Sequence, residues 1–210
     1  MIELAWEIAK KIDLNEDNLR SFLNETFSEV ARTHGLDGTH FQYRAKLMGD
    51  AFEACFEVIM KSFYPEIDLK SGVELPEACM MRQGKADFVV YQGNSSDSSE
   101  SRLIAIIEAK GSADHIVAKD GRRIKIKRPG MTRTDTVKKA ISNAYQVFRV
   151  YPDALFFIVT SHKPNSGNAK CMCDLAEGDI VDKIVDVTNI EELSEMISLI
   201  QGIDPEFQKE

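Results

Sequence analysis

The stretch RLIAIIEAKG, residues 102–111, combines a buried strand with a charged end. Five apolar residues, 103–107, are followed directly by Glu108, Ala109 and Lys110. A short apolar run rich in β-branched residues is typical of a strand in the interior of a sheet. Because side chains alternate along a strand, we expect Glu108 and Lys110 on one face and Ala109 on the other. The two charges therefore lie where a buried strand ends.

A second strand-like run, ADFVVY at residues 86–91, precedes this stretch and predicts a β-hairpin with it. The segment between them, GNSSDSSES, is rich in serine, as hairpin loops often are. A loop that is symmetric about its centre places Tyr91 opposite Ile104 and Asp87 opposite Glu108. This register brings two carboxylates side by side at one end of the sheet.

The rest of the chain reads as helices and further strands. Apolar residues recur every three or four positions through most of the first 64 residues, which is typical of amphipathic helices. A glycine and a proline follow the first two helical regions and are expected to end them. The expected helices are 2–34, 43–64, 134–150 and 190–200, and the further expected strands are 67–75, 124–127, 154–160 and 183–187. This order predicts an α/β (α+β) fold, with a central mixed β-sheet flanked by helices and an N-terminal helical segment.

The charged residues at the end of the hairpin suit a metal-dependent reaction. Two adjacent carboxylates repel each other unless a cation or a proton lies between them. Carboxylate oxygens are ligands of Mg²⁺, which completes its shell with water and substrate phosphate. Lys110 can then orient a water molecule or stabilise the charge that develops on a phosphoryl group. The alternative is a surface ion pair, since Glu-x-Lys tripeptides are common.

Asp87 and the tripeptide Glu108-Ala109-Lys110 resemble the motif of the PD-(D/E)xK nuclease superfamily, which has the restriction-endonuclease-like fold. The resemblance covers residues 43–160, and Ala86 stands where the proline of the family name would be. It implies a single nuclease domain over 1–210, with an N-terminal helical part (1–42), a catalytic core (43–160) and a C-terminal strand and helix (161–210). It also implies Mg²⁺ as the cofactor, with Mn²⁺ as a substitute.

The resemblance further implies which residues form the site. Asp87, Glu108 and Lys110 are the expected catalytic set, and Glu53 on the preceding helix is the expected additional glutamate. The expected metal ligands are Asp87, Glu108, Glu53 and the backbone carbonyl of Ala109. For Glu53 the alternative is a boundary residue that reaches solvent. Tyr145 and Gln146 are further candidates from the later helix, although an exposed helix face explains them equally well.

A basic segment follows the motif directly. Residues 110–139 contain ten Lys or Arg and three Asp, a net charge of +7, in a chain whose net charge is −8. Local charge, not the total, decides where a polyanion binds. A predicted helix start within the segment adds free N–H groups, which also favour phosphate. The expected DNA-binding residues are Lys119, Arg122, Arg123, Lys125, Lys127, Arg128, Thr132, Arg133, Thr134 and Lys138, and the alternative is a solvated loop.

These features together predict a type II restriction endonuclease, a Mg²⁺-dependent enzyme that cuts double-stranded DNA at a specific sequence and leaves 5′-phosphate ends. A homodimer is expected, because such enzymes cut both strands of a symmetric site, and residues 2–34 are a candidate interface. The alternative for those residues is packing on the sheet. Two other functions stay open, a structure-specific or repair nuclease of the junction resolvase type and a non-catalytic DNA-binding member of the fold.

The remaining features point to an ordinary globular protein. No apolar run reaches the roughly 20 residues of a membrane helix, and the polar start does not resemble a signal peptide, so a cytoplasmic protein without a membrane partner is expected. Four cysteines are too few for a disulfide framework. Cys55 is expected in the core. Cys171 and Cys173 are expected as reduced thiols in a loop or short helix, since a zinc site needs more ligands.

Overall fold

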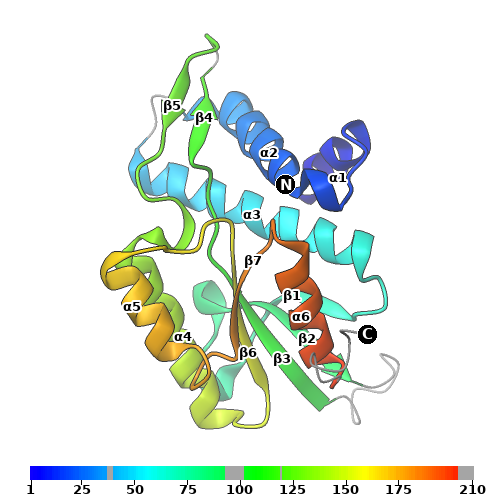
Figure 1. Ribbon diagram of the computed structural model, residues 1–210, viewed down its shortest axis with the longest axis vertical. Coiled ribbons are helices and arrows are strands. Elements are labelled where there is room, and N and C mark those ends of the chain that lie inside the picture. Colours follow the sequence, from blue (N-terminus) through cyan, green and yellow to red (C-terminus); the bar gives the residue numbers. More distant parts are fainter. Residues whose placement is uncertain (37–39, 93–101, 119, 203–210) are drawn as a thin grey trace.

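A five-stranded sheet with strand order β1-β2-β3-β6-β7 forms the centre of the molecule (Figure 1). The computed structural model describes residues 1–36, 40–92, 102–118 and 120–202. The strand β2 is antiparallel to both of its neighbours, β1 and β3, whereas β6 and β7 run parallel to β3. The mixed sheet confirms the predicted fold class. Its strands are β1 (Leu69–Val73), β2 (Ala86–Gln92), β3 (Arg102–Ala109), β6 (Leu155–Thr160) and β7 (Lys183–Asp186).

Helices cover both faces of the sheet, and alternation along β3 explains why. Ile107 and Ala109 lie in one apolar cluster with α1 (Ile2–Lys11), α2 (Leu19–His34), α3 (Phe41–Phe63) and α6 (Ile190–Ile200). Ile106 belongs to a second cluster, with α4 (Thr134–Val150) and α5 (Gly167–Ala176). A strand buried on both faces needs apolar residues at successive positions, as β3 has.

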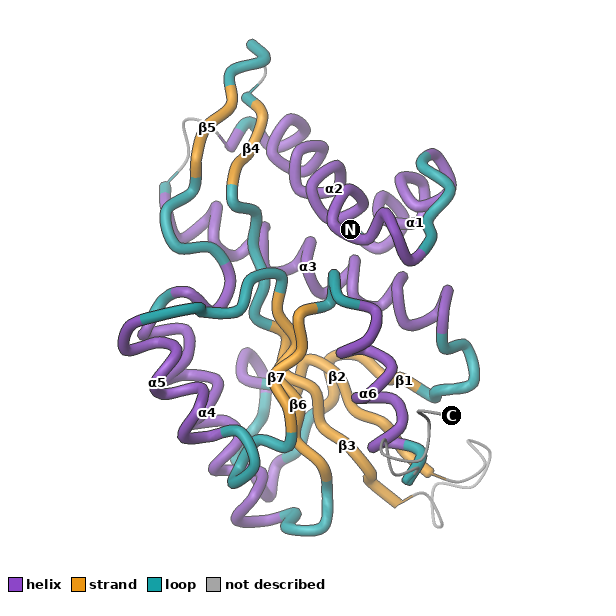
Figure 2. Tube along the Cα trace, in the orientation of Figure 1, coloured by secondary structure: helices purple, strands orange, loops and turns teal. Residues whose placement is uncertain are grey.

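The N-terminal helices pack on α3 and not on the sheet. Figure 2 shows α3 crossing between α1 and α2 on one side and the strands on the other. Ala5, Ile8, Phe22 and Phe27 are buried within this single chain. The alternative considered for residues 2–34, packing on the sheet, is therefore replaced by packing on α3, which lies between these helices and the strands. Much of their apolar surface is nonetheless used inside the chain.

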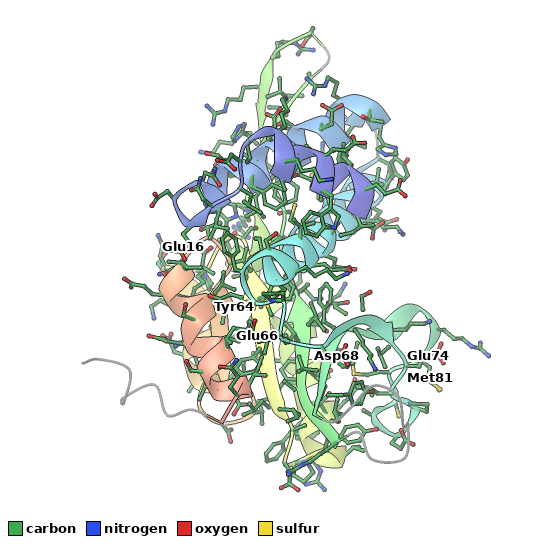
Figure 3. The ribbon with its side chains drawn as sticks, turned by 90° about the vertical axis from the view of Figure 1, so that its right-hand side faces the viewer. Glu16, Tyr64, Glu66, Asp68, Glu74 and Met81 are labelled. Atoms are coloured by element: carbon green, nitrogen blue, oxygen red, sulfur yellow. The ribbon has the colours of Figure 1, made fainter. Side chains whose placement is uncertain are left out.

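The ends of α2 and α3 follow the local signals in the sequence. Gly35 ends α2 with a φ of 60°, a left-handed conformation that glycine adopts without strain. The helix α3 ends at Phe63 with Tyr64 as its C-cap, and Pro65 follows directly. The Tyr64 hydroxyl lies 3.0 Å from Ser194 Oγ, which ties the end of α3 to α6 (Figure 3).

The register of the β2–β3 hairpin was predicted correctly at the charged end and wrongly at the loop end. Phe88 pairs with Ile107, so one further step brings Asp87 opposite Glu108. A β-bulge between Val90 and Tyr91 shifts the register, and Tyr91 pairs with Leu103 instead of Ile104. An extra residue in one strand is a feature of tertiary packing that symmetric counting cannot include. The connecting segment, 93–101, lies outside the described residues.

A small separate ribbon follows β3. Here β4 (His115–Val117) pairs with β5 (Arg123–Lys125) in antiparallel fashion, next to α2. The sequence predicted the second strand one residue late, over 124–127, and did not predict β4. Strands this short carry too little alternation to be recognised from the sequence.

The four cysteines are free thiols, two of them buried and two exposed. Cys55 is buried in the core, as predicted, and burial raises the pKa of its thiol to about 12. Cys171 and Cys173 lie on α5, a helix that the sequence left undecided, with Cys171 exposed and Cys173 buried. Residues two apart on a helix face different directions, so the pair does not converge on one ligand. In the described part of the chain, no helix is both long and apolar enough to cross a membrane.

Candidate active site

Asp87, Glu108 and Lys110 meet at the end of the β2–β3 hairpin. Lys110 Nζ lies 3.4 Å from Asp87 Oδ2 and forms an ion pair with Glu108 Oε1. The same Asp87 oxygen accepts a hydrogen bond of 2.7 Å from the backbone N–H of Ala109. Lys110 Nζ also donates to the Ala109 carbonyl at 3.0 Å. The two carboxylates, the ammonium and the Ala109 carbonyl therefore form one cluster.

Glu108 is the most deeply placed member of this cluster. Its residue is 2 % exposed, and its Oε2 atom is buried without a hydrogen-bond partner. Asn143 on α4 donates a hydrogen bond of 2.9 Å to the other oxygen, Oε1. Burial raises the pKa of Glu108, the positive charge of Lys110 opposes that shift, and the negative charge of Asp87 adds to it. A buried carboxylate that lacks a partner on one oxygen costs free energy and favours the arrival of a cation or a proton.

Lys110 balances these carboxylates. Burial by itself lowers the pKa of an amine, because it disfavours the charged form. The negative charges of Glu108 and Asp87 outweigh that effect and hold the pKa of Lys110 above its ordinary value. Lys110 is therefore the ammonium between two acidic side chains, in the position of a counter-ion.

A cleft of about 320 Å³ opens beside this cluster. The N-terminal half of α3 forms one wall, with Asp50 and Glu53, and the end of β3 forms the floor, with Ala109 and Lys110. Glu53 therefore lies at the site, as the sequence predicted. Burial raises its pKa to about 7, and the negative charge of Asp87 adds to the shift. This carboxyl can hold or release a proton near neutral pH.

Cations also line the cleft. They include three residues that the sequence assigned to DNA, Lys127, Arg128 and Arg133. Arg133 is tied to Asp135 by hydrogen bonds of 3.0 and 2.7 Å. Arg44 and Lys46 of α3 also line the cleft. They were not predicted, because they lie far from the basic segment in the sequence. Lys46 pairs with Asp50 at 2.7 Å.

The other residues assigned to DNA lie outside the cleft. Arg122, Arg123 and Lys125 are exposed on the β4–β5 ribbon or its turn, and Lys138 is exposed on α4. Thr134 begins α4, whose first turn has no side-chain cap, in agreement with the predicted helix start. The Thr132 hydroxyl donates a hydrogen bond of 2.7 Å to the Pro129 carbonyl, so this group serves the turn. Lys119 lies outside the described residues.

Two glycines allow the walls of the cleft to approach each other. A Cβ atom on Gly111 would lie 2.1 Å from the ring of Phe52, so only a glycine after Lys110 lets β3 end against α3. Gly130 has a φ of 54°, and a Cβ there would lie 2.8 Å from Thr160 Oγ1. Its N–H donates to Ser112 Oγ at 2.9 Å. The basic segment is thereby held against the ends of β3 and β6.

The helix residue that reaches the cluster is Asn143 and not Tyr145. Tyr145 is 56 % exposed, which agrees with the alternative of an exposed helix face. Asn143 lies on the α4 face that packs on the sheet, near Ala140 and Ala144, which are buried. A polar residue beside small buried residues is the sequence signal that could have identified it.

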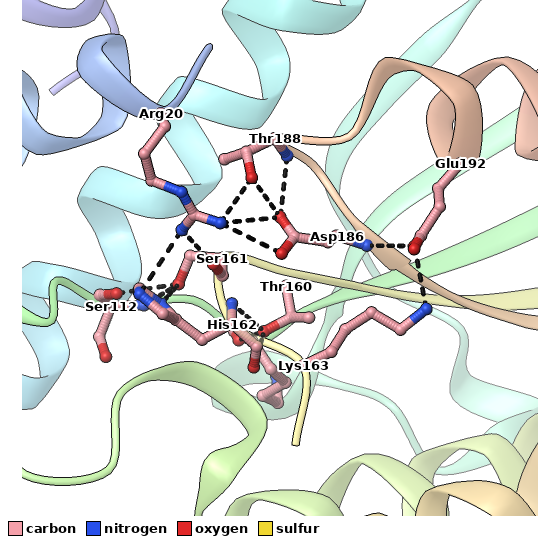
Figure 4. Close-up of polar contacts among 10 residues, drawn as sticks. Arg20, Ser112, Thr160, Ser161, His162, Lys163, Asp186, Thr188 and Glu192 are labelled. Carbon is pink, nitrogen blue, oxygen red and sulfur yellow. Dashed lines mark hydrogen bonds and ion pairs between the residues drawn. The ribbon is translucent and has the colours of Figure 1, made fainter. Parts of the chain in front are cut away.

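A second polar cluster lies at the ends of β6 and β7 and was not predicted (Figure 4). Arg20 of α2 donates to the Ser161 carbonyl, to Thr188 Oγ1 and to Asp186, whose Oδ2 lies at 3.2 Å. Ser161 and Ser112 are joined by hydrogen bonds of 3.0 and 2.8 Å. Burial and the charge of Arg20 lower the pKa of the adjacent His162. Through Arg20, this cluster connects α2 to the loops that follow β6 and β7.

The residues present fit a hard divalent cation. Oxygen donors are the ligands that Mg²⁺ prefers, and the unpartnered Glu108 Oε2 favours a cation or a proton. Asp87, Glu53 and the Ala109 carbonyl supply further oxygens around the same cleft. Among the described residues, no three His, Cys, Asp or Glu side chains form a ready-made metal group, and Lys110 is the cation between Asp87 and Glu108.

Comparison of the sequence with known proteins identifies no relative. A scan against protein-family models finds no match, and a search of curated proteins finds none at a significant level.

Proposed function

We propose that this protein is a Mg²⁺-dependent endonuclease that hydrolyses phosphodiester bonds of double-stranded DNA. The observation that carries the proposal is the cluster of Asp87, Glu108 and Lys110 beside a cleft that is lined by cations. The order of helices and strands around it, with the acids on neighbouring strands, also supports the resemblance to the PD-(D/E)xK superfamily.

The charges around the cleft suit a phosphodiester substrate. The cleft is lined both by acidic groups, Asp50 and Glu53, and by a larger number of cations. A phosphate backbone is attracted by Lys127 and Arg128, for which no ion-pair partner occurs among the described residues. Such contacts can hold the scissile phosphate next to the acidic cluster.

Each residue of the cluster has a role in this proposal. Asp87, Glu108, Glu53 and the Ala109 carbonyl would hold Mg²⁺, which supplies Lewis-acid polarisation of the phosphate when bound. Lys110 donates hydrogen bonds toward the negative charge that develops on the phosphoryl oxygens. In the metal-free protein, burial raises the pKa of Glu53 to about 7, so metal binding would release the proton that this carboxyl holds at lower pH.

Cleavage of a supercoiled plasmid of known sequence tests the proposal. We expect nicked and linear products with Mg²⁺ and none with EDTA, and cleavage about 100-fold slower or worse in Asp87→Asn and Glu108→Gln. Asp174→Asn, an exposed change on α5, is the control. Undiminished cleavage by Asp87→Asn would overturn the assignment of the site.

The products decide the finer proposal, a type II restriction endonuclease that acts as a homodimer. Discrete fragments that a ligase rejoins without prior phosphorylation indicate site-specific cleavage with 5′-phosphate ends. One cluster per chain cuts one strand, so a two-fold dimer is proposed for cutting both, and light scattering measures it. Cleavage of branched DNA alone indicates a junction resolvase, and binding without cleavage indicates a non-catalytic DNA-binding protein.

A further inference from the structure

The two faces of the β4–β5 ribbon differ sharply in chemistry. Ile116 and Ile124 pair with each other, and Ile116 is fully buried in the core cluster near α2. Because side chains alternate, the flanking pairs, His115 with Lys125 and Val117 with Arg123, point to the other face. Arg123 and Lys125 are exposed there. The ribbon is therefore anchored through its apolar face and presents a basic face outward.

The ribbon extends beyond the body of the molecule. Figures 1 and 3 show it reaching past α2 in two views at right angles. Backbone hydrogen bonds continue the pairing at both ends, from Ile126 N–H to Asp114 O at 2.7 Å and from Ala118 N–H to Arg122 O at 2.9 Å. A hydrogen-bonded two-stranded ribbon of this kind fits the major groove of B-DNA, which is about 12 Å wide.

The cations on this path differ from most others in how they are paired. Many lysines elsewhere have a nearby carboxylate, for example Lys61 with Glu57 at 2.5 Å. Arg122 in the turn is likewise paired with Asp120. In the described part of the chain, Lys125 has no such partner, and the same holds for Lys127 and Arg128 on the way to the cleft. Unpaired cations in a row favour a polyanion over a compact neutral ligand.

Arg123 has a neighbour that orients it. Its Nη2 lies 3.2 Å from His115 Nδ1, the same ring nitrogen that contacts Asp114, so Arg123 lies beside both an imidazole and a carboxylate. A guanidinium held in one direction loses less entropy when it binds, and its planar fork matches the two acceptors of guanine. Arg123 and Lys125 are two residues apart on one strand, about 6.6 Å, which corresponds to two base steps of about 3.4 Å.

We propose that the outward face of the β4–β5 ribbon lies in the major groove and that Arg123 and Lys125 read base edges there. Lys127 and Arg128 then hold the phosphates that lead into the cleft. This inference rests on the proposed function, because it takes double-stranded DNA as the partner, but it concerns recognition and not cleavage.

Selection of bound duplexes from a randomised library tests this inference without any cleavage. The selection is done in EDTA, where Lys110 compensates the two carboxylates of the cluster. We expect the unchanged protein to enrich a sequence motif, and the double variant Arg123→Ala/Lys125→Ala to lose about 10-fold or more of the discrimination at positions about two base pairs apart. The double variant Lys61→Ala/Lys170→Ala removes the same charge elsewhere and is expected to enrich the unchanged motif.

A charge-preserving variant separates base reading from simple attraction. Arg123→Lys keeps the charge but loses the bidentate fork, so we expect an unchanged salt dependence of binding and a changed preference at one position. The inference is overturned if no motif is enriched, if Arg123→Ala/Lys125→Ala enriches the same motif, or if Arg123→Lys behaves as the unchanged protein. Plasmid cleavage with Mg²⁺ is scored separately. If the protein selects a motif but does not cut, the proposed nuclease activity is refuted, whereas the proposed base recognition by the ribbon is retained.

Discussion

Asn143 on α4 and Glu108 on β3 are joined by a hydrogen bond of 2.9 Å from Nδ2 to Oε1. This contact connects the helix on one face of the sheet to the acidic cluster. It partly satisfies a carboxylate whose other oxygen is buried without a partner. Asn143 is therefore a positioning residue for Glu108.

Replacing Asn143 by alanine should lower the free energy of unfolding by about 1–3 kcal/mol, since the buried Glu108 carboxylate keeps Lys110 but loses its second donor. Asn143→Asp should cost more, because it adds a carboxylate beside Glu108. Urea unfolding in EDTA measures both changes. Ser142→Ala, an exposed neighbour on the same helix, is the control and should stay within about 0.5 kcal/mol. Equal stability of Asn143→Ala and Ser142→Ala would show that the contact has no structural role.

Replacing Lys110 by methionine should lower the free energy of unfolding by about 3 kcal/mol in EDTA, because Glu108 and Asp87 lose their shared counter-ion. Mg²⁺ no longer competes with an ammonium in this variant, so added Mg²⁺ should stabilise it more than the unchanged protein. A tenfold tighter site corresponds to about 1.4 kcal/mol. Thermal unfolding with and without Mg²⁺ measures the difference.

The control for this variant is Lys127→Met, which also removes a lysine from the cleft wall. It should leave the stabilisation by Mg²⁺ unchanged or nearly so. If Mg²⁺ stabilises Lys110→Met and the unchanged protein to the same extent, then Lys110 does not oppose cation binding.

Glu53 should make stability fall as pH rises from about 4.5 to about 7 in EDTA. Its pKa is about 7 in the folded protein and near 4.5 in the unfolded chain, so the folded state binds one proton more within this window. Above about pH 7 the ionised carboxylate costs up to about 3 kcal/mol. We therefore expect Glu53→Gln to be more stable than the unchanged protein at pH 8 and equal to it near pH 4.

Chemical unfolding across this pH range, with the difference between variant and unchanged protein plotted at each pH, isolates Glu53 from other titrating groups. Glu57→Gln, one turn later on α3 and paired with Lys61, is the control and should show no such rise toward pH 8. A pH-independent difference for Glu53→Gln would contradict the raised pKa.

Two glycines near the cleft should respond to alanine in opposite directions. Gly111→Ala places a Cβ 2.1 Å from the Phe52 ring and should destabilise the protein by about 1–3 kcal/mol, with slower cleavage because Lys110 is displaced. Gly49→Ala in α3 meets nothing within 4 Å and should stabilise the helix by up to about 1 kcal/mol. Thermal unfolding compares them, and a neutral Gly111→Ala would mean that β3 does not need this close approach.

The sequence alone determined most of the elements that hold the cluster. The structure has β3, α4 and α6 at the residues that periodicity predicted, 102–109, 134–150 and 190–200. The contact between Asp87 and the Glu108–Lys110 tripeptide also followed from the sequence, because the hairpin is local and its register follows from counting. Such features depend on short-range alternation and on turn residues.

Only the tertiary structure decided which distant residues complete the cleft. Asn143 and Arg20 reach their partners across long stretches of sequence, and Arg44 lines the cleft with residues far from it in the chain. No local period records such contacts. The bulge near Tyr91 and the ribbon packed near α2 likewise depend on packing. Local patterns fix which face of an element is apolar, whereas the pairing of polar side chains between elements depends on how those faces pack together in three dimensions.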